Sequence, residues 1–106
     1  MTARWTRAAL SELAAIHAHI AADNAAAANA LRDRAIQFVE STLADQPGIG
    51  RPGRVEGTRE AVIHPNYVMV YRVKEGVVEI LAVRHVARSW PRAFRMTFVK
   101  DCSVNK

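Results

Sequence analysis

Basic side chains suited to handling phosphate lie in the second half of the chain. Arg84, His85 and Arg88 are close neighbours in the string Arg-His-Val-Ala-Arg, and Arg59 and Arg72 precede them. A guanidinium holds phosphate oxygens through two parallel hydrogen bonds, and a histidine can transfer protons near neutral pH. The pattern indicates a site for a phosphodiester or another polyanion, with a strand-end histidine bonded to backbone as the alternative for His85.

Aromatic residues near these arginines could stack on unpaired bases. Tyr71 and Arg72 are consecutive, so on an extended strand they face opposite sides of the sheet. The arginine and aromatic candidates therefore cannot all converge on one site. The candidates for contact with a target or a nucleic acid are Arg72, Tyr71, Trp90, Arg92 and Arg95.

Other reactive residue types form no recognisable site. The single cysteine, Cys102, excludes an internal disulfide and a cysteine-type structural zinc site. His17 and His19 are two residues apart on a predicted helix and point to different faces. Gly48 and Gly50 lack the preceding strand and following helix of a nucleotide-binding loop. The sequence therefore predicts no metal and no cofactor.

The charge of the chain is unevenly distributed. Its 106 residues carry 15 Lys and Arg against 10 Asp and Glu, a net charge of +5, and residues 84–106 hold six of the basic residues and one acidic residue. A local positive field attracts nucleic acid or an acidic protein segment, although a solubilising tail would have the same composition. The length predicts one domain. No apolar run approaches the ~20 residues of a membrane span, and we expect no signal peptide and a cytoplasmic location.

The first half of the chain is predicted to form two helices. Thr6 can cap the first, and Asp23 or Asn24 can cap the second. Apolar residues recur at steps of three and four, giving two stripes: Ala9, Leu13, Ile16 and Ile20, then Leu31, Ala35, Phe38, Val39 and Leu43. Alanine-rich contact faces allow close approach, so an antiparallel helical hairpin is expected.

The second half is predicted to form strands. Residues 45–54 contain three glycines and two prolines and should lack regular structure. Strands follow at residues 58–63, 67–73 and 77–85, with a turn at Lys74-Glu75-Gly76 and a further short strand at Ala3–Trp5. The sequence predicts an α+β fold in which the helical hairpin packs on one face of a small, twisted antiparallel sheet. We expect residues 1–91 to be the domain and residues 92–106 a basic extension.

Five strings in this order resemble the RelE/ParE superfamily, the toxins of bacterial type II toxin–antitoxin modules. They span about residues 3–91 and are Ile20–Ala27, Gln46–Pro52, Gly57–Glu60, Tyr67–Val73 and Val78–His85. The resemblance implies a cognate antitoxin that wraps the toxin, giving a toxin–antitoxin hetero-oligomer. Apolar residues on the central strand and first helix are the candidates for antitoxin contact: Tyr67, Met69, Leu13 and Ile16.

The superfamily divides by target. ParE-like members act on DNA gyrase without a catalytic constellation, and RelE-like members cut messenger RNA on the ribosome. If this chain is a nuclease, the catalytic candidates are His85, Arg59, Arg84 and Arg88. However, valines stand at positions 68 and 86, where RelE-like nucleases usually have basic residues, and no tyrosine follows residue 71. His85 and Arg88 fit the His-x-x-Arg of ParE-like chains, which favours the gyrase branch. An mRNA endoribonuclease, or an inactive homologue that serves only as antitoxin partner or co-regulator, is the alternative.

Overall fold

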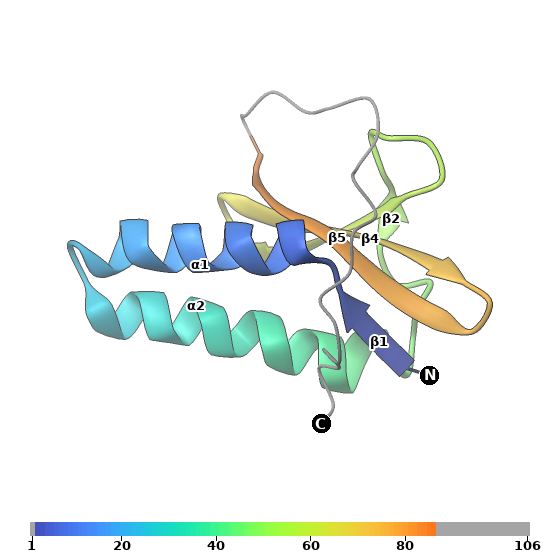
Figure 1. Cartoon of the computed structure of the whole chain (residues 1–106), viewed down its shortest axis with the longest axis horizontal. Helices are drawn as coiled ribbons and strands as arrows, with labels where there is room; N and C mark the ends of the chain where they lie inside the picture. Colours follow the sequence, from blue (N-terminus) through green and yellow to red (C-terminus); the bar gives the residue numbers. More distant parts are fainter. Residues whose placement is uncertain (1, 87–106) are drawn as a thin grey trace.

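The computed structural model describes residues 2–86 and consists of two helices beside a five-stranded sheet (Figure 1). This arrangement agrees with the predicted α+β class. The predicted extension, residues 92–106, and Cys102 lie outside the described residues. The elements in chain order are β1 (Thr2–Trp5), α1 (Arg7–Ala21), α2 (Ala25–Gln37), the π-helix η1 (Phe38–Leu43), β2 (Arg51–Pro52), β3 (Arg59–His64), β4 (Tyr67–Lys74) and β5 (Val77–His85).

The two α-helices begin at the capping residues that the sequence offers. The Thr6 hydroxyl accepts the Ala9 N–H at 3.1 Å and donates to the Ile80 carbonyl at 2.9 Å, so it caps α1 and ties it to β5. The Asn24 side chain caps α2 by accepting the Ala27 N–H at 3.0 Å. The helices lie side by side and run in opposite directions (Figure 1). No helix within residues 2–86 has both the length and the apolar character needed to cross a bilayer.

The second helix ends in a π-helical turn that the sequence did not predict. The Ala44 N–H donates to the Val39 carbonyl, five residues back, at 3.2 Å. A strict four-residue repeat drifts around an α-helix, because 3.6 residues make one turn. The wider π turn returns the end of the stripe to the core. The four residues of the stripe that repeat every four positions are all buried: Leu31, Ala35, Val39 and Leu43.

The prediction that all strands pair antiparallel is wrong for one strand, β1. The strand order is β1-β5-β4-β3-β2, and β1 pairs in parallel with β5, with Thr2 opposite Val77 and Trp5 opposite Ile80. Parallel neighbours need a long crossover connection, which the helices and the other strands supply. The three remaining pairs are antiparallel.

The loop predicted at residues 45–54 also contains a short strand. Arg51 and Pro52 pair with Glu60 and Arg59 at the edge of the sheet. Proline is tolerated at an edge because its missing N–H would otherwise face outward. The hairpin between β4 and β5 turns at Glu75 and Gly76, whose φ values of 53° and 79° suit a tight hairpin turn, as predicted.

The core lies between the helices and one face of the sheet. Trp5, Tyr71, Leu43, Met69 and Ile80 are among its largest fully buried side chains. The predicted apolar strand residues are therefore largely covered within the chain itself. Among the described residues, the large apolar side chains left exposed are Ile49, Val62 and Val73.

Candidate functional site

A cleft of about 660 Å³ opens between α1 and the end of the sheet where β4 begins and β5 ends. α1 contributes one face of its helix, at spacings of three and four residues: Glu12, Ala15, Ile16 and His19. The sheet contributes the other wall: Asn66, Tyr67, Val83, Arg84 and His85. The cleft thus combines apolar surface with ionisable side chains, a composition suited to a peptide segment that carries both.

Glu12 ties the two walls of the cleft together. One of its carboxylate oxygens accepts the Val83 N–H at 2.9 Å, and the other lies 3.1 Å from Nη2 of Arg84. Burial raises the pKa of Glu12 above its ordinary value, because the loss of hydration outweighs the Val83 N–H and the Arg84 charge, both of which lower it. The Arg84 guanidinium is therefore engaged within the chain.

Aromatic rings line the sheet side of the cleft. The Tyr67 ring centroid lies 5.4 Å from that of His64 and 5.4 Å from that of His85, the latter in an edge-on arrangement. Tyr67 and Ile16 are both half-buried and face the same cleft, so the structure brings these two predicted antitoxin contacts together. Met69 and Leu13 are instead buried in the core and offer no surface, which corrects their choice as contact residues.

Among the described residues of the predicted nuclease site, Arg84 and His85 line the same cleft, whereas Arg59 lies apart from them. Arg84 and His85 end β5, and His85 lies opposite Tyr67, whereas Arg59 lies opposite Tyr71, four residues further along β4. At ~3.3 Å per residue this places Arg59 roughly 13 Å along the sheet from His85. Arg59 donates to the Gly50 carbonyl at 2.7 Å. Arg88 lies outside the described residues.

The predicted target contacts are also separated. The Tyr71 side chain is fully buried, so it is not a stacking surface. Arg72 forms an ion pair with Glu79, its cross-strand neighbour. Trp90, Arg92 and Arg95 lie outside the described residues. Within residues 2–86, no group of three His, Cys, Asp or Glu side chains is arranged to hold a metal ion.

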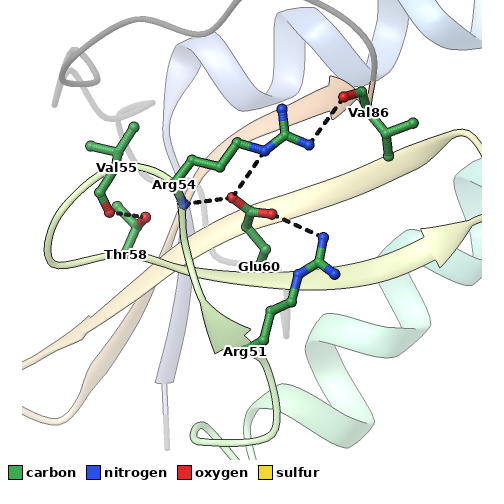
Figure 2. Close-up of polar contacts among 6 residues, drawn as sticks. All are labelled: Arg51, Arg54, Val55, Thr58, Glu60 and Val86. Carbon is green, nitrogen blue, oxygen red and sulfur yellow. Dashed lines mark hydrogen bonds and ion pairs between the residues drawn. The ribbon is translucent and has the colours of Figure 1, made fainter.

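A second ordered region is the loop before β3, which is anchored on Glu60 (Figure 2). The Glu60 side chain is 2% exposed, and its carboxylate accepts the Arg54 backbone N–H at 2.8 Å and lies 3.3 Å from Nη2 of Arg51. Arg54 reaches on to the Val86 carbonyl at 3.0 Å. Thr58 donates to the Val55 carbonyl at 2.6 Å. The loop is therefore fastened both to β3 and to the end of β5.

The start of the same loop is anchored on Tyr71. The phenol donates to the Pro47 carbonyl and accepts the Gly50 N–H, each at 2.8 Å. Burial raises the pKa of Tyr71 above its ordinary value, more than the Gly50 N–H and the Arg59 charge lower it. The phenol therefore keeps its proton and remains a donor well into the alkaline range.

The sequence-based analysis missed Glu12, His19, Ile49 and Glu60 as parts of these sites. The first two had a usable signal, since Glu12, Ile16 and His19 follow one another at steps of four and three and so share a helix face. Glu60 had a partial signal, because it stands in a predicted strand beside an arginine, as a cross-strand charge partner would. Its place beneath the loop and the position of Ile49 had none, because both depend on how an irregular loop folds on the sheet.

Comparison with known proteins identifies the family. The family model for the ParE toxin of the type II toxin–antitoxin system parDE matches residues 3–90. The chain belongs to the ParE toxin family. It is the toxin component of a type II toxin–antitoxin system. The family match spans both the cleft and the loop, so both regions belong to the ParE-type domain.

Individual relatives agree with the assignment to the toxins of the RelE/ParE superfamily. The chain is 41% identical over 90 residues to the putative toxin Y4kP of Sinorhizobium fredii, covering 84% of this chain and 92% of that protein. It is 37% identical over 84 residues to the toxin RelE2 of Caulobacter vibrioides, covering 79% and 93%. Its structure is similar to a chain of the chromosomal ParDE toxin–antitoxin system from P. aeruginosa, with a TM-score of 0.70, 29% identity and coverage of 81% and 96%.

Proposed function

We propose that this ParE-family toxin acts by binding DNA gyrase and that it does not cut RNA. The separation of the candidate nuclease residues carries this proposal. An acid or base and the groups that neutralise phosphate must reach the same phosphodiester, but Arg84 is held by Glu12 and Arg59 lies roughly 13 Å along the sheet from His85. Inhibition by binding requires no such convergence.

The test is to compare two activities of the purified toxin. We expect it to inhibit DNA supercoiling by gyrase and to leave messenger RNA on translating ribosomes intact, as measured by primer extension. Ribosome-dependent cleavage with normal supercoiling would contradict the proposal and favour the endoribonuclease. A chain that binds its antitoxin but shows neither activity would be the inactive homologue.

We also propose that the cognate antitoxin docks in the cleft beside α1. Ile16 and Tyr67 give an apolar floor, and His19, Arg84 and His85 give polar and basic walls. An amphipathic antitoxin segment that places an apolar side chain on Ile16 and an acidic one towards His85 would fit this combination. The apolar surface that such a segment buries can offset the conformational entropy that the segment loses when it becomes ordered.

Ile16→Glu tests this docking site, because it places a charge on the apolar floor. We expect the affinity for the antitoxin to fall by roughly tenfold or more. Ala18→Glu is the matched control, since Ala18 is exposed on the same helix and does not line the cleft. Equal affinities of the two variants for the antitoxin in isothermal titration calorimetry would exclude the cleft as the docking site.

A further inference from the structure

The sheet has a second apolar face, on the side away from the helices. Met69 and Tyr71 belong to the core beneath the helices, so on an alternating strand their neighbours Val68 and Val70 face the other way. Val70 lies opposite Ala82 on β5, and directly opposed residues of neighbouring strands share a face. The apolar centre of this second face therefore consists of Val68, Val70 and Ala82.

The second face is covered over β4 and β5. Val68, Val70 and Ala82 each have an exposed fraction of 0% within the single chain, although they lie outside the core beneath the helices. Val62 on β3 lies opposite Val68 but is 62% exposed, so the cover does not extend over β3. An antiparallel sheet that faces water on one side carries polar residues there. Fully buried valines on this face therefore indicate a further layer.

The end of β5 brings the chain to this face. The Val86 N–H donates to the Asn66 carbonyl at 2.9 Å, and the Val86 carbonyl accepts from Arg54 at 3.0 Å. The same guanidinium lies 3.9 Å from the Glu60 carboxylate (Figure 2). Glu60 lies opposite Val70 and so belongs to the second face. The last described residue thus stands beside the valines that need a cover.

The sequence after Val86 has the composition of a covering segment. Within residues 87–106, Phe94, Met96 and Phe98 alternate with polar residues, and alternate side chains of an extended backbone share one side. At ~3.3 Å per residue, the steps from Val86 to Phe94 span up to roughly 26 Å. This length is enough to turn back and cross β4 and β5, which lie ~5 Å apart.

We propose that the residues after Val86 turn back over the sheet and cover the second face. The side chains that supply the cover are Phe94, Met96 and Phe98. The domain then has three layers, with the sheet between the helices and residues 92–106, and these residues belong to the fold instead of forming an appended tail. A protein that used the second face would have to displace this segment first.

Thiol labelling of the full chain tests the cover. In a chain with Cys102→Ser, Ala82→Cys places a thiol on the second face and Ala61→Cys places one beneath the helices, where Ala61 is 6% exposed. Both thiols should be protected from a water-soluble maleimide. Val62→Cys is the reactive control, because Val62 lies at the exposed margin of the second face.

Two variants of the covering segment separate its apolar from its polar residues. The first replaces three apolar residues with serine: Phe94, Met96 and Phe98. The second, a matched control, replaces three polar residues with serine: Arg92, Arg95 and Thr97. We expect the first variant to accelerate labelling of Ala82→Cys about tenfold or more, the change that the loss of one buried apolar side chain corresponds to. Ala61→Cys should stay protected in both variants, and Ala82→Cys in the second.

Nuclear Overhauser spectra of the wild-type chain measure the same contact without any substitution. We expect contacts between the methyl groups of Val68 or Val70 and the ring protons of Phe94 or Phe98. If the first variant unfolded, so that the thiol beneath the helices also reacted, these spectra would decide the question. Methyl contacts restricted to residues 2–86 would then refute the cover.

Three labelling results would each overturn the inference. The first is labelling of Ala82→Cys as fast as that of Val62→Cys while residues 87–106 are otherwise native, because the second face would then be open. The second is equal protection of Ala82→Cys in the two segment variants, which would assign the cover to residues 2–86. The third is protection of Ala82→Cys that disappears on dilution, which would assign the cover to a second copy of the chain.

Discussion

At the residue scale, two glutamates hold separate elements of the chain together. Glu12 on α1 bonds to the Val83 N–H and pairs with Arg84 on β5. Glu60 on β3 fastens the preceding loop through Arg51 and Arg54. Each carboxylate is partly or fully removed from water and is compensated by arginine and backbone donors.

Glu12 should titrate above its ordinary pKa near 4.5, because burial raises the pKa of this carboxyl. The folded state then holds the proton more tightly than the unfolded chain. The contribution of Glu12 to stability is therefore complete at low pH and is lost as the pH rises from the unfolded to the folded pKa. Carboxyl NMR titration of wild type measures the midpoint directly.

Arg84→Gln should raise the Glu12 pKa further, since the Arg84 charge lowers it. Arg7→Gln is the control, because it removes the same charge from an exposed position on α1. A wild-type midpoint at or below the ordinary value, or equal midpoints in the two variants, would contradict this account of the cleft.

Glu60→Gln should lower the free energy of unfolding by about 1–2 kcal/mol, as measured by urea unfolding. Breaking a buried ion pair costs more than breaking an exposed one, but the partly exposed arginines remain solvated, which limits the loss. Asp33→Asn breaks the exposed pair with Arg32 and should change stability by less than about 0.5 kcal/mol. Equal effects of the two substitutions on the free energy of unfolding would show that Glu60 does not hold the loop on the sheet.

At the scale of elements, sequence patterns predicted what local physics controls. The caps at Thr6 and Asn24 and the turn at Gly76 follow from short-range chemistry, and all three are present. The parallel pairing of β1 with β5 joins residues about 75 positions apart, so no local pattern contains it. The two-residue strand β2 lies among glycines and prolines that favour a loop, and only the edge of β3 makes it a strand.

The same limit applied to the sites. The residues of the cleft that carry charge or an aromatic ring, Tyr67, Arg84 and His85, stood out in the sequence by type. The ion pair of Arg84 with Glu12 and the ring contact of Tyr67 with His85 could not be predicted from the sequence, because they depend on how α1 and the strands are arranged in space. Burial of Tyr71 was equally hidden, since an alternating strand does not show which face the helices cover.

Gly50→Ala should destabilise the fold by about 1–3 kcal/mol, because the added methyl group meets the Tyr71 hydroxyl and the Glu60 backbone. Gly48→Ala is the control two residues earlier. No atom lies within 4 Å of its added Cβ, and its φ lies outside the left-handed region. It should be neutral or stabilise slightly by restricting the unfolded chain. Similar losses in thermal unfolding for both variants would contradict the tight contact at Gly50.

At the scale of the whole molecule, the described domain presents two surfaces of different character. The cleft beside α1 is concave and suits an ordered peptide segment. The loop that carries Ile49 lies further along the strands, beside β2 and β3.

The most direct test of toxicity by binding is the stoichiometry of gyrase inhibition. Purified toxin should be titrated into supercoiling reactions at several fixed gyrase concentrations well above the dissociation constant. A toxin that acts by binding must give an endpoint that moves in proportion to the gyrase concentration, and added antitoxin should restore supercoiling. Two results together would contradict the account. Gyrase would supercoil DNA fully at a molar excess of toxin, and toxin at a concentration far below that of the ribosomes would cut ribosome-bound messenger RNA.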